Sequence, residues 1–305
     1  ETALEEDFEV VGVLVKDRER RRPVDVHPDL LVFEAGDLLA CGPELVIEVI
    51  GGTDTADELI TASRARGIPV VSANKQLLAL DPDLLRPAVD GDVRDLVCSA
   101  AVGGGVPALE TVAAILEQEP VVAIEGVLNG TCNFVLDRCG QGTDLETAVA
   151  EAQKLGLAEA DPHQDVSGLD ALYKLALLAS QAFDRPVAPE DIVCEGLDRL
   201  SPERIEQSRR DGKALTVGAD AGRSGAEILA RVADRPRAPD DPLAACRGEG
   251  NTLLVETASG RKIRVVGKGA GRWPTTVSVV GDALQVRRDL VTGQHALNRR
   301  KAALS

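Results

Sequence analysis

The chain has 305 residues, of which 44% are hydrophobic and 28% charged, a composition typical of a globular protein with one or two domains. Its formal net charge of −16 argues against nucleic acid as a partner, because binding to phosphates needs a basic surface. No run of about 18 apolar residues and no secretory leader is recognisable, so we expect no membrane partner and a cytoplasmic location.

The first part of the chain alternates between short apolar segments and helical patterns. We expect strands at four places: residues 8–15, 45–50, 68–73 and 93–98. The pattern over residues 56–66 indicates a helix between two of these strands. Apolar, branched strands that are separated by helices favour a parallel α/β sheet.

From Gly103 onward the pattern changes to longer helices and more widely spaced strands. Helix starts are expected at four residues: Gly130, Asp144, Ser167 and Ser201. Ser201 is followed by Pro202, which is typical of a capping serine and a first helical position. Strands are expected at residues 121–128, 226–232, 252–257 and 261–267. Residues 234–242 are rich in Pro, Asp and Arg, which predicts a surface loop.

The segment of residues 156–174 is the most informative part of the sequence. It contains four acids followed by one lysine: Glu159, Asp161, Asp165, Asp170 and Lys174. Asp170 and Lys174 are spaced i, i+4, so they share one face of the helix that we expect to begin at Ser167. In a structural interpretation, Ser167 and Asp170 form a capping box, and Asp170 and Lys174 form an ordinary helix ion pair.

A functional interpretation of the same segment is equally open. A developing alkoxide needs a proton donor, and a lysine in a partly buried site can supply that proton. The neighbouring carboxylates would then bind the ammonium group of a small polar substrate or orient the lysine. In this interpretation Lys174 is the proton donor.

Three further segments each have a functional and a structural interpretation. Asn74 and Lys75 follow a predicted parallel strand, where open α/β sheets bind ligands, although a lysine there can also be a surface residue. The glycines of residues 103–105 let the backbone approach a ligand or ion, or form a tight packing turn. The glycine cluster of residues 267–271 precedes an apolar segment at 277–284, which suits an anion or a cofactor, or only a connecting turn.

Taken together, these segments resemble the homoserine dehydrogenase family. The matching strings follow the family's order over nearly the whole chain, and the most specific are ANK at 73–75, EGVLNGT at 125–131 and EADPHQDVSGLDALYK at 159–174. The resemblance implies an α/β fold in which a Rossmann-type nucleotide-binding domain is interrupted by an α+β domain for substrate binding and dimerisation. It implies a homodimer, with the first domain at residues 1–98 and 268–305 and the second at 99–267.

The same resemblance implies NAD(P)-dependent interconversion of L-homoserine and L-aspartate 4-semialdehyde, a step in threonine and methionine biosynthesis. Lys174 would be the proton donor and Lys75 would assist near the nicotinamide. Substrate binding is implied for three acids: Glu159, Asp165 and Asp170. Cofactor contacts are implied for Ile50, Gly51, Lys75, Gly156, Gly269, Ala270 and Gly271. A sodium ion would be held by the backbone carbonyls of Val102, Gly104 and Val106.

Two departures from the family's pattern affect the cofactor and the metal. The family begins with a strand and a G-x-G-x-x-G turn that cradles the pyrophosphate, and here residues 1–7 contain no glycine. Either the natural protein begins before Glu1, as the missing methionine indicates, or it is a non-catalytic binding or scaffold relative that lost this G-x-G-x-x-G turn. The family usually has a glutamate where Ser99 stands, so the sodium site would lose its charged ligand.

The choice of cofactor and of substrate is only partly legible in the sequence. The basic run of residues 18–22 follows the strand expected at 8–15, and cations at this place favour NADP over NAD because they suit the extra phosphate. Another NAD(P)-dependent enzyme that acts on a related aldehyde or amino acid is a further interpretation.

Overall fold

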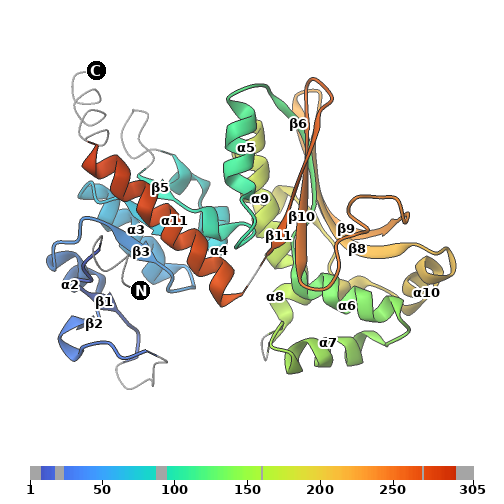
Figure 1. Ribbon diagram of the computed structural model, residues 1–305, viewed down its shortest axis with the longest axis horizontal. Coiled ribbons are helices and arrows are strands. Elements are labelled where there is room, and N and C mark those ends of the chain that lie inside the picture. Colours follow the sequence, from blue (N-terminus) through green and yellow to red (C-terminus); the bar gives the residue numbers. More distant parts are fainter. Residues whose placement is uncertain (1–7, 18–23, 87–94, 159–160, 270, 293–305) are drawn as a thin grey trace.

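The N-terminal part of the chain forms two small parallel sheets (Figure 1). The computed structural model describes residues 8–17, 24–86, 95–158, 161–269 and 271–292. One sheet pairs β1 (Val13–Leu14) with β2 (Leu31–Val32), and the other has the order β3 (Val46–Glu48), β4 (Val70–Ser72), β5 (Leu96–Val97). Helices α2 (Ala35–Ala40), α3 (Asp54–Ala65) and α4 (Lys75–Leu80) connect the strands.

The parallel pairing confirms the expected α/β arrangement, with shorter strands than the sequence predicts. Of the strand expected at 8–15, only Val13 and Leu14 pair as β1. The elements β2, α2 and α4 were not predicted, because each spans only two to six residues and carries little periodicity.

The sheet β3-β4-β5 is covered on both faces. Val70 of β4 belongs to the same core as Leu59 of α3, whereas Val71 packs with Val279 and Val286 of α11 (Arg272–Val291). Successive strand residues point to opposite faces, so α3 and α11 lie on opposite sides of the sheet. Figure 1 shows the red helix α11 lying across this part of the molecule, so the end of the chain returns to its beginning.

The second part of the chain builds one mixed sheet of six strands in the order β11-β10-β6-β8-β9-β7. Its strands are β6 (Val121–Val127), β7 (Val193–Cys194), β8 (Ala214–Ser224), β9 (Glu227–Arg237), β10 (Gly250–Thr257) and β11 (Lys262–Lys268). All neighbours are antiparallel except β7 and β9. The helices of this part are α5 (Ala108–Leu116), α6 (Gly130–Gly140), α7 (Leu145–Lys154), α8 (His163–Val166), α9 (Leu169–Phe183) and α10 (Pro202–Arg210).

The helix α9 is the centre of the core. It is buried on nearly all sides, as expected for a helix that lies between other elements rather than on a surface. It contacts the sheet through β6, β8 and β9, and it packs against α5 and against α4 of the N-terminal part. Leu78 of α4 and Leu178 of α9 belong to one continuous apolar cluster. The packing of α4 on α9 brings the carboxyl end of β4 to the start of α9.

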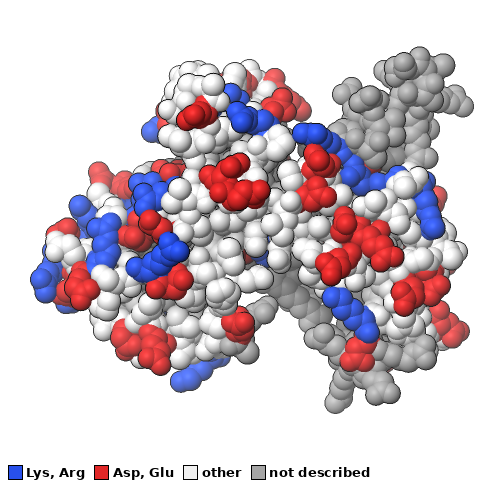
Figure 2. Space-filling view, turned by 180° about the vertical axis from the view of Figure 1, so that it is seen from behind, with Lys and Arg blue, Asp and Glu red and all other residues white. Residues whose placement is uncertain are grey.

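The remaining described elements are short or lie at the surface. Five 3-10 helices span Pro28–Leu30, Pro82–Leu85, Ser99–Ala101, Pro189–Asp191 and Leu197–Arg199. Within the described residues, no helix combines the length and the apolar character needed to cross a membrane. On the face shown in Figure 2, basic side chains are interspersed with acidic ones rather than gathered in one patch.

Two predictions for the second part were wrong. The strand β8 was missed because it is rich in alanine and glycine, which have low strand propensity. The first four residues of the loop expected at 234–242 belong to a strand instead, since β9 continues to Arg237. Its charged residues stay in the strand because they form ion pairs: Arg235 lies 2.7 Å from Asp220, and Arg237 lies 2.9 Å from Glu125.

Candidate active site

Asp170 lies at the centre of a buried group of charged and polar side chains at the start of α9. Its carboxylate oxygens face two different ammonium groups: Lys174 Nζ is 2.7 Å from Oδ2, and Lys75 Nζ is 3.2 Å from Oδ1. Asp170 is 8% exposed and Lys174 is 5% exposed. We call Lys75, Asn129, Asp165, Asp170 and Lys174 the Asp170 cluster. Lys75 comes from α4 of the N-terminal part and Asp170 from α9, so this contact joins the two parts of the chain.

Asn129 connects the two acids of the cluster. Its Nδ2 donates to Asp165 Oδ1 and to Asp170 Oδ2, each at 2.7 Å. Its Oδ1 accepts the N–H of Cys132 at 2.7 Å and thereby caps α6. Sequence reasoning did not select Asn129, although the residue stands in the specific string EGVLNGT.

Lys174 is held by two acceptors on different elements. Besides Asp170, its ammonium donates to the backbone carbonyl of Leu128 at 2.9 Å. The amide of Asn251 donates to the same carbonyl at 2.8 Å. The direction of the Lys174 side chain is therefore set by α9, by the end of β6 and indirectly by β10.

The two acids of the cluster differ in their electrostatics. Burial works to raise the pKa of Asp170, but the charges of Lys174 and Lys75 and the bonds from Lys174 and Asn129 leave that pKa below its ordinary value. Burial raises the pKa of Asp165, and the bond from Asn129 only partly offsets this effect. Asp170 is thus a permanent anion at neutral pH, and Asp165 holds its charge less readily.

The structural interpretation of this segment was wrong in its main feature. The helix α9 begins after Gly168, which has a φ of 83°, and no side chain caps it. Ser167 ends α8 instead, so no capping box forms with Asp170. The ion pair between Asp170 and Lys174 exists, but it is buried instead of lying on a helix surface.

Lys75 is also more than a surface lysine. The strand β4 ends at Ser72, and Asn74 caps α4 by accepting the N–H of Leu77 at 3.2 Å. Lys75 is the first residue of α4 and its side chain is 31% exposed. The cap fixes the direction in which Lys75 leaves the strand end, toward Asp170.

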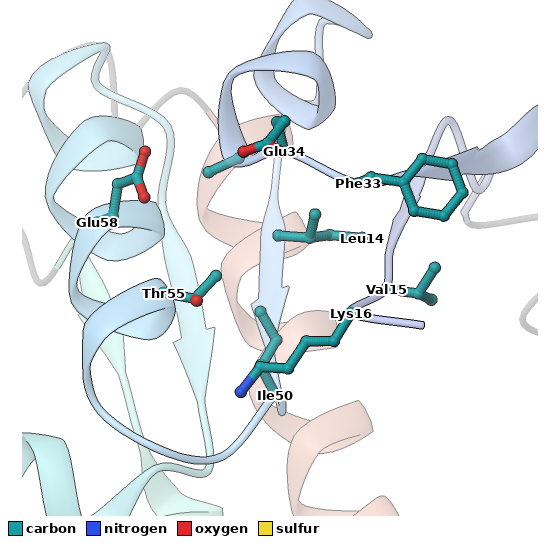
Figure 3. A pocket seen from close by; sticks show the side chains of 9 residues that line it. Leu14, Val15, Lys16, Phe33, Glu34, Ile50, Thr55 and Glu58 are labelled. Carbon is teal, nitrogen blue, oxygen red and sulfur yellow. The ribbon is translucent and has the colours of Figure 1, made fainter. Parts of the chain in front are cut away.

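A pocket of about 110 Å³ lies at the carboxyl ends of β1, β2 and β3. Figure 3 shows its lining: Leu14, Val15, Lys16, Phe33, Glu34, Ala35, Ile50, Thr55 and Glu58. The side chain of Lys16 extends toward Ile50 in this view. Ligands of open α/β sheets bind outside the carboxyl ends of the strands, so this pocket suits part of a nucleotide.

Known proteins match both parts of the chain. A family model described as "Homoserine dehydrogenase, NAD binding domain" matches residues 1–90, and one described as "Homoserine dehydrogenase" matches residues 107–284. The chain belongs to the homoserine dehydrogenase family. It is 35% identical over 95% of its length to the homoserine dehydrogenase of Corynebacterium glutamicum, and 36% identical over 92% to that of Bacillus subtilis.

A solved homoserine dehydrogenase from Thiobacillus denitrificans has the same fold as this chain. It superposes with a TM-score of 0.80 and 30% identity over 86% of the chain. The chain spans 66% of the length of the Corynebacterium protein, 65% of the Bacillus protein and 61% of the Thiobacillus chain. The architecture of an NAD-binding domain and a second domain is therefore confirmed.

The glycines of this chain that the sequence assigns to cofactor binding differ from one another in conformation and packing. Gly51 adopts a φ of 71° directly after β3, and Gly156 adopts 72° after α7. Gly269 packs so closely on Asn251 that a Cβ at this position would overlap the amide. Gly271 adopts 111° just before α11. Glu159, Ala270 and the basic run of residues 18–22 lie outside the described residues.

The turn expected to hold a sodium ion is bonded to the protein itself. Gly104 O accepts the hydroxyl of Ser278, and Val106 O accepts the N–H of Ala108 at 2.7 Å. At the position of the family's glutamate, the N–H of Ser99 donates to Asp282 of α11 at 2.9 Å. Within the described residues, no group of three His, Cys, Asp or Glu could hold a metal. The carbonyls of Gly104 and Val106 already accept hydrogen bonds and Ser99 brings no carboxylate of its own, so these residues do not fit a sodium ion and we derive no step through one.

The two glycine segments of the sequence meet in space. Gly105 donates its N–H to Lys268 O at 3.1 Å, and a Cβ at Gly267 would press on the Gly105 carbonyl. In both segments, glycines therefore serve close packing of one loop on the other, as the structural interpretation expects. They join the loop before α5 to the end of β11.

Proposed function

We propose that the protein is an NAD(P)-dependent homoserine dehydrogenase that interconverts L-homoserine and L-aspartate 4-semialdehyde. The observation that carries this proposal is the Asp170 cluster, in which two ammonium groups and two acids meet beside the carboxyl edge of the nucleotide-binding sheet. Membership of the family supplies the reaction class, and the cluster supplies the groups that this reaction needs.

Lys174 is the proton donor in the direction of reduction. A nicotinamide cofactor, when bound, would supply the hydride for the aldehyde carbon, and the carbonyl oxygen would then need a proton. Lys174 donates two of its three N–H groups to Asp170 and to the carbonyl of Leu128. These two bonds fix the direction of the third N–H, which is the one that would reach the alkoxide. Asp170 holds the ammonium in place, and Lys75 adds a second positive charge near the developing alkoxide.

Asp165 and Asp170, together with Glu159, bind the amino-acid part of the substrate. An ammonium group beside Asp165 would favour the charged form of this carboxylate, against the effect of burial on its pKa. Asn129 holds Asp165 and Asp170 at a fixed separation through its two bonds. The acid pair is thus preorganised for a cation.

Ile50, Gly51, Gly156, Gly269, Ala270 and Gly271 would contact the cofactor, together with Lys75. Support comes from the turn after β3 and from the neighbouring pocket, both at the carboxyl edge of the sheet. Lys16 brings a cation to the pocket, but Glu34 and Glu58 line it too, so these three residues do not favour the extra phosphate of NADP. The preference for NADP rests on residues 18–22.

The division into residues 1–98 with 268–305 and residues 99–267 is also proposed. It is supported by the separate sheets of the two parts and by the packing of α11 on the N-terminal sheet. The homodimer, the cytoplasmic location and the sodium ion at Val102, Gly104 and Val106 stay predictions.

Replacement of Lys174 by alanine in the natural full-length protein tests the proposal. We expect kcat for homoserine oxidation to fall by about 10²–10⁴-fold, as for the loss of a general acid–base group, while homoserine binding stays nearly intact. Lys154→Ala, at an exposed position of α7, is the control and keeps near-native turnover.

Two results would contradict the proposal. Near-native turnover of Lys174→Ala removes the proton-donor role. A wild-type protein that binds homoserine but turns it over with neither NAD nor NADP is a non-catalytic relative and not the proposed enzyme.

A further inference from the structure

We propose that Glu48 is a positioning residue that ties the cofactor turn of residues 50–52 to Lys75. The inference rests on the proposed function, because it assigns Glu48 a role in cofactor binding and turnover. Glu48 would act through its bonds to Ile50 and Ser72 and not by touching the cofactor or the substrate. Glu48 is the last residue of β3 and is 0% exposed.

The carboxylate of Glu48 is bonded through both oxygens. Oε1 accepts the backbone N–H of Ile50 at 2.9 Å, and Oε2 accepts the hydroxyl of Ser72 at 2.6 Å. A carboxylate in the interior is unfavourable unless such partners offset the loss of water. An apolar residue would fill the core at this place more easily, so the acid indicates a need for these two bonds.

These bonds belong to a closed ring across the ends of two strands. Ser72 Oγ also accepts the N–H of Asn74 at 3.1 Å, and Asn74 Nδ2 donates to the carbonyl of Gly52 at 2.7 Å. The ring therefore runs from Glu48 to the turn that starts at Ile50, through Asn74 to Ser72, and back to Glu48. It is built from side chains of β3 and of the β4–α4 junction.

The ring holds the cofactor turn at both ends. Gly51 and Gly52 have φ values of 71° and 76°, and two glycines in sequence give a backbone wide conformational freedom. Glu48 binds the residue before these glycines, and Asn74 binds the second glycine. Without these two attachments the turn would have many accessible shapes, and the cofactor would have to select one.

The same ring fixes the start of α4. Asn74 is the cap of α4, and Lys75, which reaches Asp170, follows it directly. Glu48 thus acts on the turn through Ile50 and on Lys75 through Ser72 and Asn74. A loss of Glu48 should weaken cofactor binding and turnover together, and it should leave the binding of homoserine unchanged, since Asp165 and Asn129 lie outside the ring.

Two variants of the natural full-length enzyme test this inference. Glu48→Gln keeps the shape of the side chain but removes its charge and one acceptor oxygen. The amide oxygen can still accept the Ile50 N–H, whereas the bond with Ser72 must reverse, with the amide donating to the hydroxyl, and both bonds lose the strength that the charge gives them. Ser72→Ala removes the hydroxyl and keeps Glu48. For each we expect the Kd of NADPH or NADH, measured by fluorescence titration, to rise about tenfold, and kcat to fall by a similar factor, because about one hydrogen bond's free energy is lost. The KM for homoserine stays within about twofold, since no substrate group is touched.

Ser63→Ala is the matched control. Ser63 is a serine with 0% exposure in the same part of the chain, but its hydroxyl donates to Leu59 O within α3, away from the ring. This variant should change the melting temperature only. The double variant Glu48→Gln with Ser72→Ala should be no worse than the more affected single variant, because both break the same link.

The outcomes separate the inference from the proposed function. Kinetic constants and cofactor affinity of both variants equal to those of Ser63→Ala, with only stability changed, would overturn the positioning role and leave the dehydrogenase proposal intact. Cofactor binding by the wild type without turnover of homoserine would contradict the dehydrogenase proposal, and the titration would still test the ring. A wild type that binds neither cofactor would overturn both.

Discussion

Replacing Asp170 by asparagine removes a charge at the centre of the Asp170 cluster and keeps the shape of the side chain. The amide oxygen can still accept a hydrogen bond from Asn129, so the main loss is electrostatic. Lys174, with its side chain 7% exposed, and Lys75 would then face each other without the carboxylate between them. We expect a clear loss of stability for this reason.

The size of the loss follows from the burial of the partners. Breaking a buried ion pair by removing one partner costs about 3–5 kcal/mol. Lys75 contributes little, because its side chain is 31% exposed and can turn to water. We therefore expect about 3 kcal/mol from the pair with Lys174, which corresponds to a fall in Tm of roughly 6–12 °C for a domain of this size.

The effect should depend on pH in one direction. The pKa of Asp170 is lower in the folded protein than its ordinary value, because the two lysines stabilise the anion against burial. Such a group stabilises the fold fully above its unfolded pKa of about 3.9, and this contribution is lost as the pH falls through the lower folded pKa. The difference between wild type and Asp170→Asn should therefore be constant near neutral pH and shrink below about pH 4.

Urea unfolding of both proteins at several pH values measures this difference. Asp240→Asn, at an exposed loop position, is the control for removal of one negative charge and should behave as the wild type. An Asp170→Asn protein as stable as this control at pH 7 would refute the reasoning. A difference that persists unchanged into acid would also refute it, because the charge of Asp170 would then not be its source.

Two further predictions concern residues outside the reacting groups. Gly269→Ala should lower stability by about 1–3 kcal/mol, because the new methyl group overlaps the Asn251 amide; thermal unfolding checks this, and an unchanged Tm contradicts it. Arg237→Ala should lower the free energy of unfolding by about 1–2 kcal/mol, since the buried guanidinium loses its packing and its hydrogen bonds, whereas Glu125 and Asp241, with side chains 40% and 27% exposed, can turn to water. Lys262→Ala, which removes an exposed ion pair of β11, should change it by less than about 0.5 kcal/mol, and equal effects of the two variants would contradict the role of burial.

The sequence was sufficient where one short segment carried its own signal. Ser201 and Pro202 predicted a capped helix, and Ser201 Oγ does accept the N–H of Arg204 at 3.2 Å. The spacing of Asp170 and Lys174 predicted their contact, because four residues make one turn of any helix. What the spacing could not tell is that this face of α9 is buried, since burial depends on the elements packed around it.

The parts of the site that were missed depend on contacts between distant residues. Asn129 and Asp170 are 41 residues apart, and Glu48 and Ser72 are 24 residues apart. Glu48 stands in an apolar strand pattern, where a single acid gives no indication of the hydroxyl that faces it on the next strand. The capping box failed for a local reason, since Gly168 adopts a left-handed conformation that leaves Ser167 in the preceding helix.

The return of α11 to the N-terminal sheet limits how the two parts can move. The backbone passes from one part to the other near Cys98 and again near Gly269, so two backbone connections link the parts instead of one. Two connections allow less relative motion than one, and the apolar cluster that α4 and α9 share opposes a separation of the two parts, because it would expose buried apolar side chains. The ion pair between Lys75 and Asp170 lies at the same boundary, so its geometry depends on the packing of α4 on α9 and not the reverse.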